Sequence, residues 1–167
     1  MKNFISILLS GFLITTGPRA FAVNSSPKIV KTFNPSSINI NEFVTMTIAF
    51  SNPGSEVANF TAPFSESLPE GVIILGFATT TCGGTLIAQT GSSKFSLVKA
   101  KIPAFAACQI MLGVTATKAG NFTSKTPAAA LQTDKGSNLL SSSATLTVIK
   151  YVPVELRIIK SFKPSVI

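Results

Sequence analysis

The chain has 167 residues, of which 46% are hydrophobic and 12% are charged, and its formal net charge at pH 7 is +8. It contains no histidine, which argues against Ser-His-Asp and Cys-His hydrolysis and against the commonest metal sites. The basic residues form no block of five or more and show little interleaving with aromatics, so nucleic acid is not an expected partner. The few acids form neither a calcium loop nor a catalytic carboxylate pair. We therefore expect no enzyme activity, no catalytic residue, no metal and no cofactor.

Residues 1–22 have the features of a secretory signal peptide. Lys2 supplies the positive charge, Phe4–Thr15 form an apolar core, and Gly17-Pro18 interrupt it. Small residues at Ala20 and Ala22 predict cleavage after Ala22. The alternative is a retained membrane anchor, which the short core disfavours, and no later apolar run is long enough for a transmembrane helix. We expect an exported protein at the cell surface or outside the cell, with the periplasm as the alternative.

The rest of the chain has the composition of an all-β protein. Phe43–Ser51 and Ala107–Thr117 alternate apolar and polar residues, the period of a half-buried strand. Gly71–Phe77 is a nearly continuous apolar run, which predicts a strand buried on both faces. Similar segments recur from Lys28 to Ile149 between turns rich in Gly, Pro and Ser, and give about eight to nine short strands. We predict an Ig-like antiparallel β-sandwich over residues 23–149, although the tryptophan of immunoglobulin domains is absent.

The two cysteines, Cys82 and Cys108, are predicted to form a disulfide, because an even pair in an exported chain is usually oxidised. A redox pair would need a closer spacing, and a metal pair would need further ligands. The alternation of the second clear strand places Cys108 on its inward face.

The first strand of the predicted sandwich occurs twice. Lys28–Ile38 reads KIVKTFNPSSI, and Arg157–Ile167 reads RIIKSFKPSVI. Six positions are identical: Ile29/Ile158, Lys31/Lys160, Phe33/Phe162, Pro35/Pro164, Ser36/Ser165 and Ile38/Ile167. The two copies begin about one domain length apart. We therefore interpret residues 150–167 as a linker and the first strand of a truncated second repeat.

A series of motifs resembles a known family. KTFNPSSI, TMTIAFSNPG, SESLPEGVII, TTCGG, AACQIMLGVTATKAGNF and SATLTV follow one another in this order. The series resembles the Ig-like conserved-repeat domain of bacterial surface proteins, domain of unknown function eleven and its relatives. Glu66-Ser67-Leu68-Pro69 departs from the acidic D-x-LP of that family. The resemblance implies a non-catalytic stalk, spacer or adhesin, whose partners are neighbouring repeats of the same polypeptide, other surface proteins, or host or envelope glycans and proteins.

Two further hypotheses concern individual loops and side chains. The alternative function is a soluble module that binds a glycan or protein through loops 56–70 and 83–93. Surface β-sandwiches can also contain a Lys–Asn isopeptide bond beside a buried acid, and Lys31, Glu66 and Asn121 are the candidate residues. The competing interpretation is that Lys31 lies along the surface with its ammonium group in water.

Overall fold

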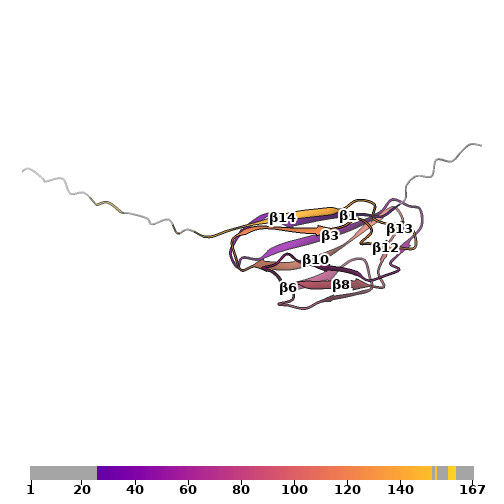
Figure 1. The fold of residues 1–167 in the computed structure, drawn as a ribbon, viewed down its shortest axis with the longest axis horizontal. Helices are drawn as coiled ribbons and strands as arrows, with labels where there is room; N and C mark the ends of the chain where they lie inside the picture. Colours follow the sequence, from indigo (N-terminus) through magenta and orange to yellow (C-terminus); the bar gives the residue numbers. More distant parts are fainter. Residues whose placement is uncertain (1–25, 152, 154–157, 161–167) are drawn as a thin grey trace, which may run out of the picture.

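The computed structural model describes residues 26–151, 153 and 158–160 and shows an all-β fold (Figure 1). Over these residues the strands are β1 (Lys28–Asn34), β2 (Ser37–Asn39), β3 (Val44–Asn52), β4 (Ala58–Asn59), β5 (Phe64–Ser67), β6 (Val72–Thr80), β7 (Thr85–Ala88), β8 (Lys94–Val98), β9 (Lys101–Ile102), β10 (Ala106–Ala116), β11 (Gly120–Thr126), β12 (Gln132–Thr133), β13 (Gly136–Ser137) and β14 (Ser142–Ile149). Nine of these strands have four or more residues, in agreement with the predicted eight to nine. The predicted signal peptide and its cleavage residues, Ala20 and Ala22, lie outside the described residues, as does most of the second copy of the first strand.

One layer of the fold is a four-stranded antiparallel sheet in the order β1-β3-β10-β6. Its central strand β3 alternates strictly between buried and half-buried residues, as its sequence predicts. Met46, Ile48 and Phe50 lie opposite Leu112, Ile110 and Cys108 of β10, all facing inward. The two strands with the clearest alternation therefore form the centre of the core.

Two three-stranded sheets cover the inner face of this layer, in the orders β5-β8-β7 and β11-β14-β2. The Phe50 ring of β3 packs edge-on against Phe64 of β5, with ring centroids 4.9 Å apart. The predicted β-sandwich is thus confirmed, with one exception to the antiparallel pattern, because β2 pairs with β14 in parallel. The Asn34–Pro35 peptide bond that follows β1 is cis. β1 belongs to the four-stranded sheet and β2 to the opposite layer, so residues 28–39 contribute to both layers.

Two predicted strands differ from the structure. In β6 the inward residues Val72 and Ile74 are buried, but Leu75 and Phe77 are 39% and 40% exposed, so burial on both faces is wrong. Gly76 has a φ of +90° and lies in an irregularity of the β6–β10 pairing, between the pairs Ile74–Val114 and Ala78–Leu112. The sequence of Ala128–Thr133 also predicts a strand, but the structure has one only at Gln132–Thr133, because the residues before them turn.

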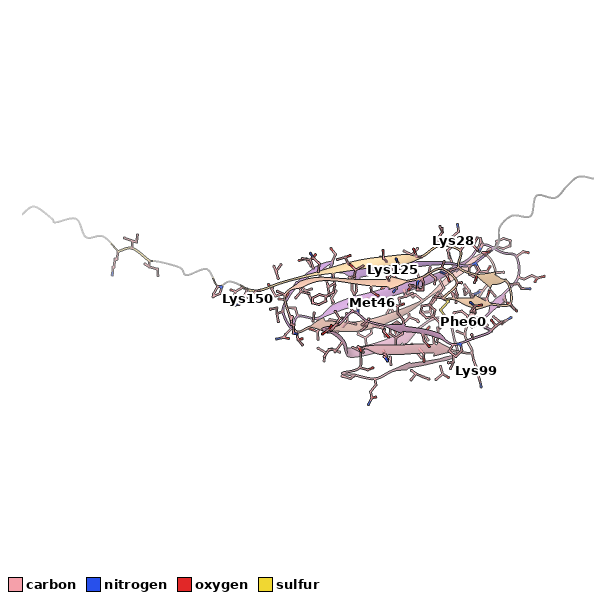
Figure 2. All side chains as sticks on the ribbon, viewed as in Figure 1. Lys28, Met46, Phe60, Lys99, Lys125 and Lys150 are labelled. Atoms are coloured by element: carbon pink, nitrogen blue, oxygen red, sulfur yellow. A yellow bond between two sulfur atoms is a disulfide. The ribbon has the colours of Figure 1, made fainter. Side chains whose placement is uncertain are left out.

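The described domain is elongated, and its ends are far apart. Figure 2 labels Lys28, where β1 begins, at one end of the molecule and Lys150, just after β14, at the other. The chain therefore enters at one end of the long axis and leaves at the opposite end. Within the described residues, no helix is long and apolar enough to cross a bilayer.

Candidate functional site

The predicted disulfide is confirmed. Cys82, in the turn after β6, is bonded to Cys108 of β10, with the two Cα atoms 4.9 Å apart. Both cysteines are buried, so the bond lies within the core. The neighbouring backbone is ordered by a hydrogen bond from the Lys101 amide to the Cys82 carbonyl, 3.0 Å long.

Lys31 of β1 points into the space between the layers, and its side chain has no exposed surface. The interpretation that its ammonium group lies in water is wrong, because the alternation of β1 turns Lys31 inward together with Ile29 and Phe33. Its Nζ atom forms an ion pair with Glu66 of β5 and donates a hydrogen bond of 2.8 Å to Ser124 Oγ. Burial lowers the pKa of Lys31, and the nearby Glu66 carboxylate opposes this effect.

Glu66 completes a polar cluster that joins the four-stranded sheet to both three-stranded sheets. Ser124 Oγ donates to Glu66 Oε1 over 2.7 Å, and Thr126 Oγ1 donates to Oε2 over 2.8 Å. Only 6% of the Glu66 side chain is exposed. Each oxygen of the carboxylate thus has a hydroxyl donor, and one of them is also paired with Lys31. We call Lys31, Glu66, Ser124 and Thr126 the buried polar cluster.

Asn121, the third residue of the isopeptide hypothesis, is not part of this cluster. It lies on β11, three positions before Ser124, and successive strand residues face opposite sides. Asn121 is therefore exposed, and its Oδ1 accepts a 3.0 Å hydrogen bond from Thr147 Oγ1. The structure brings Lys31 and Glu66 together but leaves Asn121 on the outside of the sandwich. The expected pairing of Lys31 with Asn121 is therefore wrong.

The two loops of the alternative hypothesis contribute to one shallow hollow of about 370 Å³. Its lining includes Ser65 and Ser67 from the first loop and Ile87 from the second. Lys94 of β8 adds a positive charge. A second hollow of similar volume lies between the facing edges of β5 and β11, and Glu66 and Thr126 form part of its wall.

The outer face of the four-stranded sheet carries little charge. Among its strand residues the only ionisable side chain is Lys28 at one corner. The outward positions are Lys28, Val30, Thr32, Asn34, Thr45, Thr47, Ala49, Ser51, Ala107, Gln109, Met111, Gly113, Thr115, Ile73, Leu75, Phe77 and Thr79. No other sheet pairs with or covers this face within the described residues.

One corner of the outer face is apolar. The rings of Phe43 and Phe77 lie against each other, with centroids 5.8 Å apart, and Leu75 is the preceding outward residue of β6. The Phe43 ring rests on Gly113, where an added Cβ would be only 2.3 Å from it. We call Phe43, Leu75 and Phe77 the apolar patch. Its residues are each 39–46% exposed. The sequence does not predict this patch, because the apolar run that contains Leu75 and Phe77 is typical of a strand buried on both faces.

With the fold established, the chain can be compared with known proteins. Residues 27–148 match a family described as Domain of unknown function (DUF7933). The chain belongs to this family. The matching family is therefore not the domain of unknown function eleven that the motifs resemble. No curated protein matches this DUF7933 chain.

The DUF7933 domain is similar in structure to BslA, a bacterial hydrophobin. The two share 15% sequence identity with a TM-score of 0.52, over 77% of this chain and 97% of BslA, which shows a common fold. A non-cellulosomal cohesin from the archaeon Archaeoglobus fulgidus is 8% identical, with a TM-score of 0.47, over 75% of this chain and 92% of the cohesin. The seventh ScaB type I cohesin from Pseudobacteroides cellulosolvens is 13% identical, with a TM-score of 0.43, over 80% of this chain and 98% of the cohesin.

Proposed function

We propose that this protein is an exported, non-catalytic repeat of a surface protein, which acts as a spacer and offers its outer sheet face to a protein partner. The observation that carries the proposal is the position of the chain ends, since Lys28 and Lys150 lie at opposite ends of the domain. Tandem copies joined through such ends would extend along one axis. Pro153 in the connecting segment would restrict the bending of the joint.

The repeated segment supports a second domain of the same kind. Within the first copy, Lys28–Ile38, the residues that are buried in the structure are Ile29, Lys31, Phe33 and Ile38. All four are identical in the second copy, whereas five of the seven remaining positions differ. Identity at the inward positions is what a strand needs to enter another sandwich core in the same register. We therefore assign residues 150–167 to a linker and the first strand of a second repeat.

Export and the absence of catalysis have separate support. The buried Cys82–Cys108 disulfide suits an oxidising compartment, and the sequence of residues 1–22 predicts a signal peptide cleaved after Ala22. The chain has no histidine to act as a general base near neutral pH. Within the described residues, no group of three His, Cys, Asp or Glu side chains is arranged to hold a metal ion.

The outer face is the best-supported contact surface. It combines low charge with the apolar patch, and interface centres are depleted in charged residues and enriched in aromatic ones. Phe43 and Phe77 would act as anchors, because their rings are already held by Gly113 and by each other. Little side-chain entropy would then be lost on binding.

Small-angle scattering on the natural polypeptide that contains this repeat tests the spacer function. We expect the largest dimension to grow in proportion to the number of repeats, and a compact particle of constant dimension would refute the spacer function.

Adhesion of cells that display the protein tests the outer face. Phe77→Asp should reduce adhesion, whereas Ile87→Asp, at an exposed apolar residue of β7, should not. Equal adhesion by both variants and the wild type would contradict this contact surface.

A ligand-binding function remains the second candidate, because both predicted loops line the same hollow beside Lys94. An acidic glycan or peptide would suit its charge. Lys94→Glu should then abolish reproducible binding on a glycan or protein array, while Lys118→Glu, in the turn before β11, should leave it unchanged. Binding that is insensitive to Lys94 would rule this site out.

A further inference from the structure

We propose that Lys31 and Glu66 condense in the folded domain to an intramolecular amide that joins Lys31 Nζ to Glu66 Cδ. This bond would be a covalent link between the two layers of the sandwich, since β1 belongs to the four-stranded sheet and β5 to a sheet of the opposite layer. It differs from a Lys–Asn bond because the acceptor is the carboxyl group of the acid itself.

The contact geometry is the first support. The amine and the carboxylate touch, and the two side chains are 0% and 6% exposed. Their strands come from different sheets and are held in place by a core that includes Ile29, Phe33 and Phe64 on either side of the pair. The reacting groups are therefore fixed next to each other in a nearly water-free site, the condition under which an intramolecular reaction gains most from proximity.

The reaction needs no further reagent. Transfer of one proton from the ammonium to the carboxylate gives a neutral amine and a carboxylic acid. The Nζ lone pair then attacks Cδ, and a C–N bond forms as the carbonyl π electrons move to oxygen. When the carbonyl re-forms, one C–O bond breaks, and the departing hydroxyl takes the second proton of nitrogen and leaves as water. The ion pair thus contains every atom of the amide and of the water released.

Burial favours the first of these steps. Desolvation penalises both charges of an ion pair, and only direct pairing and hydrogen bonds offset the penalty. Lys31 shows this effect, because burial lowers its pKa and so favours the neutral, nucleophilic amine. Replacing a buried ion pair by a neutral amide removes both charges from the interior.

The two hydroxyls of the buried polar cluster suit the later steps. Lys31 Nζ donates to Ser124 Oγ, and Ser124 Oγ donates to Glu66 Oε1, at 2.8 and 2.7 Å. These two hydrogen bonds connect the nitrogen that loses protons to the oxygen that leaves as water, so the Ser124 hydroxyl can relay a proton between them. Thr126 Oγ1 donates to the other oxygen, Oε2, where negative charge develops in the tetrahedral intermediate. The hollow between β5 and β11, which Glu66 lines, gives the water a way out.

Intact-mass spectrometry of the exported, disulfide-bonded protein provides the test. We expect a mass lower by one water molecule than that of the disulfide-bonded chain. Trypsin should fail to cut after Lys31, and fragmentation should identify the peptide of Lys31 joined to the peptide of Glu66. A wild-type protein with the full disulfide-bonded mass would overturn the proposal, whatever the behaviour of the variants.

Variants separate the chemistry from mere packing. Lys31→Arg keeps the positive charge but lacks a nucleophilic amine, so the water loss should disappear. Glu66→Gln should release ammonia in place of water, a different change in mass. Ser124→Ala should slow the appearance of the linked species after refolding. A water loss that persists in Lys31→Arg would place the dehydration elsewhere and refute the assignment.

Discussion

Replacing Gly113 by alanine tests the geometry of the apolar patch. An added Cβ would lie 2.3 Å from Phe43 Cε2 and 2.4 Å from the Leu75 carbonyl oxygen. The Phe43 ring could rotate away, but the carbonyl belongs to the backbone of β6 beside the register shift. Overpacking of this kind costs about 1–3 kcal/mol, and the lower entropy of an unfolded chain with alanine returns about 0.5–1 kcal/mol. The net range is about 0–2.5 kcal/mol, and we expect Gly113→Ala to reduce the free energy of unfolding by roughly 1 kcal/mol, near its middle.

Urea unfolding monitored by circular dichroism would measure the change. When the free energy of unfolding falls with urea at the same slope in both proteins, the shift in midpoint reports the change in stability. Phe43→Ala alone should cost about 1 kcal/mol, since its ring is roughly half buried. In the double variant the cost of Gly113→Ala should shrink but persist, because the contact with the Leu75 carbonyl remains. A midpoint for Gly113→Ala equal to or above that of the wild type would refute the packing described for this corner.

Three further outcomes can be measured. Replacing Cys82 and Cys108 together by alanine should lower the stability by about 3.5 kcal/mol, the entropy of a loop of this length, and an unchanged melting temperature would show that the bond is incidental. Phe50→Ala should cost about 3–5 kcal/mol by calorimetry, because a fully buried ring is lost between two other rings; a loss below about 1 kcal/mol would contradict its place in the core. Hydrogen bonds from the side chain and then the backbone of Asn59 hold the pKa of Asp134 below 3.8. The stability that these hydrogen bonds contribute is present above pH 3.8 and is lost as the pH falls through the lowered pKa of Asp134 in the folded protein. Asp134→Asn should therefore flatten the decline of the urea midpoint below pH 3.8. An identical decline in both proteins would argue against the interaction.

The sequence predicts those parts of the fold in which local pattern and tertiary burial agree. In β3 and β10 every second side chain is apolar, and the core accepts these side chains, so strand position and inward face follow from periodicity. The pairing of Cys82 with Cys108 follows from their number and the expected compartment. In each case one physical preference decides the outcome without reference to distant residues.

The apolar patch and the buried polar cluster depend on distant contacts, which a single sequence does not reveal. Leu75 and Phe77 read as interior residues, but they occupy outward positions of β6, where Phe77 packs against Phe43 and both side chains stay about 40% exposed. Ser124 reads as an ordinary strand hydroxyl, and only the packing of β11 against β1 and β5 makes it a partner of Lys31 and Glu66. The sequence did indicate Lys31 and Glu66 but not the residues that complete their cluster.

The arrangement of the first and last strands has a mechanical consequence. β1 and β14 lie side by side, and both run from the Lys28 end of the domain towards the Lys150 end (Figures 1 and 2). A tensile force applied at the two chain ends would therefore slide these strands past each other lengthwise. The parallel ladder between β2 and β14 would be loaded in shear, so that its hydrogen bonds must fail together. A domain pulled in this direction resists rupture far better than one whose strands are peeled apart bond by bond.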